Sequence, residues 1–133
     1  MPLSDPTASP VSPAALIVDD DETLRKLLGL ALGRYGFRIH HAAEGREAIT
    51  LFERHRAEID VVVLDVRMPG CGGPETLSEL RRLRPGIPVV FVTGYMGDLA
   101  EEELLTQGAT RVFYKPFPLI EFAEYVRGLV TRV

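Results

Sequence analysis

The stretch VVVLD at residues 61–65 decides the fold class of this chain. An unbroken run of β-branched and aliphatic residues predicts a strand buried on both faces, as in a parallel sheet covered by helices. Three further runs have the same form and also end on polar residues, namely LIVDDD at 16–21, VVFVT at 89–93 and VFYK at 112–115. Because open parallel sheets bind ligands beyond the carboxyl ends of their strands, these polar residues are candidates for one shared site.

Helical patterns alternate with these strands. Apolar spacing predicts helices over 24–35, 44–55, 73–83, 98–107 and from 118 nearly to the C-terminus, and a short strand over 37–42. The alternation over 14–133 predicts an α/β fold, a flavodoxin-like doubly wound five-stranded parallel sheet flanked by five helices. In the strand order 2-1-3-4-5, the strands that precede Asp19 and Asp65 are neighbours, so their carboxylates are expected to converge.

Composition predicts one domain. The chain has 133 residues, 46% of them hydrophobic, with a net charge of −4. Prolines at 2, 6, 10 and 13 predict a disordered tail over 1–13 before a folded domain over 14–133. No Lys/Arg block favours direct nucleic-acid binding, and no run approaches the ~20 apolar residues of a membrane span. The single Cys71 and the absence of a signal-peptide pattern favour the cytoplasm.

The strand-end residues have a definite chemistry. Asp19, Asp20 and Asp65 would repel one another unless a cation or protons intervened, and all-oxygen ligands favour Mg²⁺ where phosphate is involved. Lys115 offers a compact positive charge to a phosphoryl oxygen, and Thr93 offers a hydrogen bond to it. An Asp carboxylate beside Mg²⁺ and Lys is a competent nucleophile towards phosphorus.

Four motifs now carry a family resemblance. They are Val18-Asp19-Asp20, Asp65-x-x-Met68-Pro69-Gly70, Thr93-Gly94 and Lys115-Pro116-Phe117. In this order, each at a strand end, they resemble the receiver domain of two-component response regulators over about residues 14–131. The segment MPGCGGPE at 68–75 and the Thr-Gly-Tyr at 93–95 are similar to receivers attached to hybrid histidine kinases, which would make the chain one such domain rather than a free regulator.

The resemblance implies a role for each site residue. Asp65 would be the phosphoacceptor, Asp19 and Asp20 would bind Mg²⁺, and the backbone carbonyl of Arg67 would complete the protein ligands. Thr93 would be the switch hydroxyl. Lys115 would contact the phosphate, and the Lys115-Pro116 bond would be cis.

Three positions depart from the common receiver pattern. Many receivers carry Tyr or Phe three residues before the motif lysine, where this chain has Val112, while Phe113 would point to the opposite face. Arg67 and Tyr95 stand two residues after the phosphoacceptor and the switch threonine. We hypothesise that these two side chains shield the phosphoaspartate and slow its hydrolysis.

Three functions are compatible with this sequence. The first is a phosphoacceptor signalling module that receives its phosphoryl group from a histidine kinase or histidine phosphotransfer protein. Because no effector domain follows Val133, its output would be altered partner binding through the helix over 98–107, the strand over 110–114 and the last helix, as a monomer or a phosphorylation-dependent dimer. The second is a phosphatase or phosphotransferase with an Asp nucleophile acting on a small substrate, although such enzymes usually carry an acid where Arg67 stands. The third is a flavin- or nucleotide-binding flavodoxin-like protein, which the acidic turn at 19–21 disfavours.

Overall fold

The computed structural model describes residues 12–68, 70–94, 105–106 and 108–130. Its five strands are β2 (Ala14–Val18), β3 (Arg38–Ala42), β4 (Ile59–Asp65), β5 (Val89–Thr93) and β6 (Arg111–Tyr114). They form one all-parallel sheet in the order β3-β2-β4-β5-β6. This is the predicted order 2-1-3-4-5, and it confirms the flavodoxin-like fold. The strand predicted over 61–64 is longer than expected, because Ile59 and Asp60 extend it at its start.

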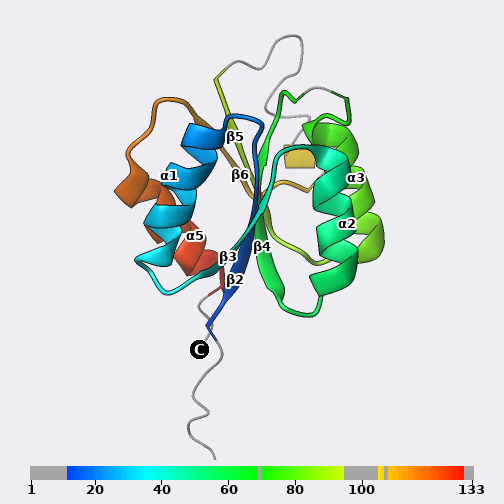
Figure 1. Ribbon diagram of the computed structural model, residues 1–133, viewed down its shortest axis with the longest axis horizontal. Coiled ribbons are helices and arrows are strands. Elements are labelled where there is room, and N and C mark those ends of the chain that lie inside the picture. Colours follow the sequence, from blue (N-terminus) through cyan, green and yellow to red (C-terminus); the bar gives the residue numbers. More distant parts are fainter. Residues whose placement is uncertain (1–11, 69, 95–104, 107, 131–133) are drawn as a thin grey trace, which may run out of the picture.

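Four helices lie within the described residues, α1 (Glu22–Gly33), α2 (Gly45–His55), α3 (Gly73–Leu83) and α5 (Leu119–Val130). The fifth predicted helix, over 98–107, lies largely outside the described residues. Figure 1 shows the sheet between two helical layers, with α1 and α5 on one side and α2 and α3 on the other. Helix α1 ends at Gly33, and a turn leads to Gly36 at a φ of +93°, a conformation that glycine adopts without strain.

The sheet has a hydrophobic core on each face. Alternate residues of every strand point to opposite faces, so each central strand feeds both cores. In β4, Val62 and Leu64 pack with the α2–α3 layer, whereas Val61 and Val63 pack with the α1–α5 layer. This double burial explains why the central strands β2, β4 and β5 are almost continuously apolar, and why their polar side chains lie near the strand ends.

Candidate functional site

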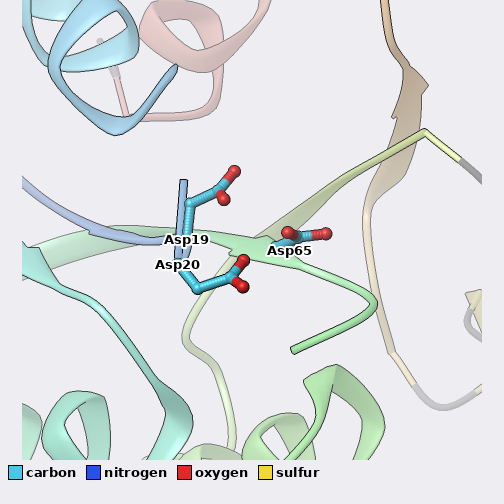
Figure 2. Close-up of side chains that lie close together, drawn as sticks. All are labelled: Asp19, Asp20 and Asp65. Atoms are coloured by element: carbon cyan, nitrogen blue, oxygen red, sulfur yellow. The ribbon is translucent and has the colours of Figure 1, made fainter. Parts of the chain in front are cut away.

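Three carboxylates meet at the carboxyl edge of the sheet. Asp19 and Asp20 follow the last residue of β2, and Asp65 is the last residue of β4. The two strands are parallel, hydrogen-bonded neighbours with Val18 opposite Leu64, so the residues that follow, Asp19 and Asp65, lie at the same edge of the sheet. One oxygen from each carboxylate lies within 4.8 Å of the others. Figure 2 shows the cluster. The predicted convergence is therefore present.

Asp19 is fully buried and held by its own turn. Its backbone N–H donates to the Ala42 carbonyl of β3 at 3.1 Å, and its Oδ1 accepts from the Asp21 N–H at 2.9 Å. Asp21 in turn caps α1, because its Oδ1 accepts from the Leu24 N–H at 3.2 Å. This capping is the ordinary structural use of an Asp before a helix. It leaves Asp19 and Asp20 as the two acids of the turn that face the cluster.

The protonation of Asp65 reflects its crowded position. Burial, and next the charge of Asp19, raise the pKa of Asp65 to about 7. Lys115 and a hydrogen bond from the Arg67 N–H, at 3.3 Å from Oδ1, act in the opposite direction. Burial disfavours the ionised form of Asp65, and the neighbouring negative charge of Asp19 adds to that effect. The cluster is thus an incompletely neutralised anionic site that a cation would complete.

Lys115 comes from the far end of the chain into the same site. Its Nζ lies 3.4 Å from Asp19 Oδ2 and 3.7 Å from Asp65 Oδ2. About a quarter of the Lys115 side chain is exposed, so this residue borders the cluster and is partly accessible to solvent. The Lys115-Pro116 peptide is cis, as the resemblance implied.

Thr93 is buried at the end of β5, beside β4. Its strand pairs with β4 so that Val92 lies opposite Asp65, and the Thr93 carbonyl accepts from the Lys115 N–H at 2.8 Å. Strand pairing therefore places Thr93 and Lys115 at one level along the sheet. The predicted constellation of acid, hydroxyl and lysine shares the same sheet edge.

The three unusual positions are placed as follows. Arg67 is exposed just beyond Asp65, whereas Tyr95 lies outside the described residues. Val112 is buried in the core on the α2–α3 side of the sheet, and Phe113 is buried on the α1–α5 side, where its ring contacts Phe117 and Phe122. The expectation that Phe113 points to the opposite face from Val112 is confirmed.

Glycines set the path of the loop after Asp65. A Cβ on Gly73 would lie 2.7 Å from the Asp65 carbonyl oxygen and 2.8 Å from both Val66 Cα and Phe91 Cε1. Such distances are closer than side-chain carbons tolerate, so the start of α3 packs directly on the strand end that carries Asp65. Sequence reasoning identified Gly73 as a helix start but missed this close approach, which depends on a contact with Phe91 from another strand.

A hollow of about 590 Å³ opens beside Lys115. Its walls come from the start of α1 and from the segment that joins β6 to α5, and its lining is Asp21, Thr23, Leu24, Leu27, Lys115, Pro116, Phe117 and Leu119. Most of this lining is apolar. A partner that enters the hollow would contact both the apolar wall and the lysine next to Asp65.

The donor set fits a hard divalent cation. All three converging ligands are carboxylates, the site has one exposed and two buried members, and burial followed by the charge of Asp19 raises the pKa of Asp65. Oxygen-only sites of this kind suit Mg²⁺ or Ca²⁺ rather than the nitrogen- and sulfur-seeking transition metals.

Comparison with known proteins gives the family. Residues 15–127 match the family model of the response regulator receiver domain. The chain belongs to this family. Receiver domains are signalling modules of two-component systems, and the four motifs quoted above fall within the matched range.

Relatives and solved structures agree with this assignment. The chain is 36% identical over 91% of its length to the sensor kinase CckA of Brucella abortus and 37% identical over 88% to the probable transcriptional regulatory protein TcrX of Mycobacterium tuberculosis. It covers 13% and 49% of those proteins, so it spans at most about half the length of these curated relatives.

Two solved structures of receiver-type proteins are similar to this chain in fold. The CheY of Borrelia burgdorferi, crystallised with CheX, BeF3 and Mg²⁺, matches with a TM-score of 0.85 and 26% identity over 95% of each chain. The receiver domain of the hybrid histidine kinase CckA matches with a TM-score of 0.73 and 28% identity over 89% of this chain and 99% of that one. Within the described part of this receiver domain, no helix combines the length and apolar character needed to cross a membrane.

Proposed function

We propose that this receiver domain takes a phosphoryl group onto Asp65 from the phosphohistidine of a histidine kinase or a histidine phosphotransfer protein. The observation that carries the proposal is the meeting of Lys115 Nζ, Asp19 and Asp65 within 3.4 to 3.7 Å at one open sheet edge. An Asp65 oxygen attacks phosphorus, the O–P bond forms as the N–P bond breaks, and the electron pair stays on the donor imidazole. Lys115 binds a phosphoryl oxygen as negative charge moves onto it.

Asp19, Asp20, Asp65 and the Arg67 carbonyl would hold Mg²⁺. When bound, the ion supplies positive charge that neutralises the phosphoryl oxygens in the transition state. The three carboxylates support this ligand set through their spacing, and the Mg²⁺ in the Borrelia CheY complex supports the choice of ion. A cation held there would favour the ionised form of Asp65, whose carboxylate is the proposed nucleophile.

Phosphorylation would then shift a pre-existing conformational equilibrium. Thr93 would donate its hydroxyl to the phosphoryl group, and Lys115 would transmit the change to β6 and α5. The output partner would bind across residues 98–107, β6 and α5, where Tyr114 is exposed on β6. Val112 provides no rotating aromatic here, so the coupling would depend on Thr93 and Lys115. We place the domain in the cytoplasm, as a monomer or a phosphorylation-dependent dimer, without direct nucleic-acid or membrane binding.

The test is chemical phosphorylation with acetyl phosphate and Mg²⁺, followed by intact mass measurement and peptide mapping. We expect one phosphoryl group, on Asp65, that is labile to base and requires the cation. Asp65→Asn should abolish it, whereas Asp60→Asn, on the same strand but away from the site, should be phosphorylated as the natural chain is. Phosphate that persists in Asp65→Asn would refute the assignment, and steady hydrolysis of many small phosphate esters would favour the enzyme hypothesis.

A further inference from the structure

A basic side chain outside the carboxylate cluster forms a hydrogen bond with the turn that carries Asp19 and Asp20. Arg25 lies in α1, and its NH1 donates to the backbone carbonyl of Asp19 at 2.7 Å. The backbone N–H of Arg25 also donates to the Asp21 carbonyl at 2.9 Å. The second bond is the first backbone bond of α1, which any residue other than proline would make, so the contact special to Arg25 is its side-chain bond to the Asp19 carbonyl.

This hydrogen bond acts on the peptide unit between Asp19 and Asp20. The Asp19 C=O and the Asp20 N–H belong to one rigid plane. Fixing the carbonyl oxygen restricts the rotation of that plane, and so restricts where the Asp20 Cα lies, the atom from which its side chain leaves the backbone. Asp19 is further held by Ala42 and Asp21, but Asp20 is exposed. The Arg25 contact therefore bears on how the two neighbouring carboxylates are aimed relative to each other.

The Arg25 side chain is partly buried against the turn. Its Nε is buried and is one of two buried side-chain nitrogens, among the described residues, without a hydrogen-bond partner. An unpaired buried donor is unfavourable, so the side chain is held in this position by its other contacts, among them the bond to the Asp19 carbonyl. The neighbouring Lys26 is, by contrast, two-thirds exposed and forms an ordinary ion pair with Glu22 at 3.0 Å.

We propose that Arg25 is a positioning residue for the cation site, holding the Asp19–Asp20 peptide in the orientation that lets both carboxylates face Asp65. The proposal rests on the proposed function only in the assumption that these carboxylates bind Mg²⁺. Arg25 does not itself contact the ion. Its effect is the opposite of what its charge alone would produce, because a nearby positive charge repels a cation.

That difference in sign makes the test sharp. Mg²⁺ affinity is measured by calorimetry on unphosphorylated Arg25→Met and on Lys26→Met, which removes the same charge one residue away. We expect Arg25→Met to bind Mg²⁺ about 10-fold more weakly, the lower end of the effect of outer-shell partners on metal affinity. Lys26→Met should bind Mg²⁺ as tightly as the natural chain or slightly more tightly. Equal or tighter binding by Arg25→Met would overturn the positioning role.

Two further measurements separate positioning from a general structural role. In the metal-free protein, Arg25→Met should accelerate hydrogen exchange of the Asp20 and Asp21 amides while core amides of β4 stay protected. Arg25→Lys, which keeps one donor, should recover part of the Mg²⁺ affinity, and it carries the test if Arg25→Met does not fold. Uniformly faster exchange across the sheet would contradict the proposal, as would a loss of Mg²⁺ affinity in Arg25→Lys without faster exchange of the Asp20 and Asp21 amides.

Failure of this inference is distinguishable from failure of the proposed function. If the natural chain binds Mg²⁺ but acetyl phosphate does not modify Asp65, the phosphoacceptor proposal fails and the Arg25 measurements still apply. If Asp65 is phosphorylated and Arg25→Met keeps the natural Mg²⁺ affinity, only the positioning role is lost. A natural chain that binds no Mg²⁺ refutes both through the cation site.

Discussion

The ionised carboxylate of Asp65 is unfavourable in the folded chain when no cation is bound. The strand pattern buries its backbone and most of its carboxyl group, and the neighbouring strand end adds Asp19 beside it. Burial and the Asp19 charge raise the pKa of Asp65 to about 7, from an ordinary value of 3.8. The folded state therefore binds a proton at Asp65, between about pH 4 and 7, that the unfolded state releases.

The sign of this linkage gives a first prediction. Because the folded pKa is raised, the metal-free protein should lose stability from Asp65 as pH rises from about 4 to 7, and the loss should be complete above that range. Asp65→Asn removes the charge and should raise the free energy of unfolding by about 1–3 kcal/mol at pH 8, less than the full shift because the site mouth is open to water. At pH 4.5 the gain should be small.

Urea unfolding at the two pH values, without Mg²⁺, measures this difference. Asp60→Asn is the matched control, because Asp60 lies on the same strand and accepts a hydrogen bond from the Ala14 N–H at 2.9 Å, outside the cluster. An Asp65→Asn gain that is the same at both pH values would show that ionisation of Asp65 is not its source.

Arg67 gives a second prediction at the residue scale. Arg67 is exposed two residues beyond Asp65, and its backbone N–H donates to the Asp65 carboxylate. The Arg67 Cα therefore lies close to the position that a phosphoryl group on Asp65 would occupy. If the Arg67 side chain shields that group from water, Arg67→Ala should hydrolyse phosphoaspartate about 3–10 times faster, which corresponds to about 0.7–1.4 kcal/mol of the barrier. Phosphoprotein decay after removal of acetyl phosphate measures the rate, with Arg46→Ala on α2 as a control for loss of positive charge.

Tyr95 lies outside the described part of the chain, so its shielding of the phosphoaspartate stays a prediction. The same decay assay on Tyr95→Ala tests it. Unchanged or slower decay in both Arg67→Ala and Tyr95→Ala would remove the shielding hypothesis.

At the scale of elements, the start of α3 determines where Asp65 lies. Gly73 packs against the Asp65 carbonyl, Val66 and Phe91 at distances that leave no room for a Cβ. Helix α3 and strand β4 are therefore in contact through backbone at the site itself. Two elements that fit together in this way place the phosphoacceptor more accurately than a loop of larger residues would.

We predict that Gly73→Ala destabilises the protein by about 1–3 kcal/mol, the usual effect of overpacking a well-packed contact. It should also slow phosphorylation of Asp65, because the displaced carbonyl belongs to that residue. Gly33→Ala is the matched control, since a Cβ at this last residue of α1 meets nothing within 4 Å. That control should leave stability unchanged or raise it by up to about 1 kcal/mol through helix propensity. Urea midpoints of the two variants test the contrast, and equal effects would show that the close approach is unimportant.

At the scale of the whole molecule, cation binding and folding are linked. Asp19 and Asp20 follow one strand and Asp65 ends another, so the complete ligand set exists only in the folded chain. Mg²⁺ should therefore stabilise the fold by mass action, by about 2.7 kcal/mol at one hundred times its dissociation constant. The urea concentration at the unfolding midpoint should rise when Mg²⁺ is added and return to its metal-free value when a chelator is added.

The control variants sharpen this last prediction. Asp20→Asn removes an exposed ligand with little effect on packing and should abolish most of the Mg²⁺ response, whereas Asp60→Asn should keep it. A response of equal size in Asp20→Asn would place the cation elsewhere on the molecule.

Much of this molecule is determined by sequence-local pattern. Three of the four apolar runs form the central strands β2, β4 and β5, because burial on both faces requires apolar side chains at successive positions, and the fourth forms the edge strand β6. The same runs end on Asp19, Asp65, Thr93 and Lys115, so the candidate site residues and the strand order follow from the chain alone. Phe113 was predicted on the opposite face from Val112, and the alternation of β-strand side chains explains why this prediction is correct.

Tertiary structure alone decided the remaining features, because they depend on segments that are distant in the sequence. Lys115 and Asp19 are 96 residues apart, and only strand order and packing bring their charges to 3.4 Å. Tertiary packing also produces three other features. These are the raised pKa of Asp65, the Gly73 contact with Phe91 and the hydrogen bond from Arg25 to the Asp19 carbonyl. Sequence determines which chemistry each strand end carries. Packing determines how far apart those groups lie, and electrostatic and steric energies depend on distance.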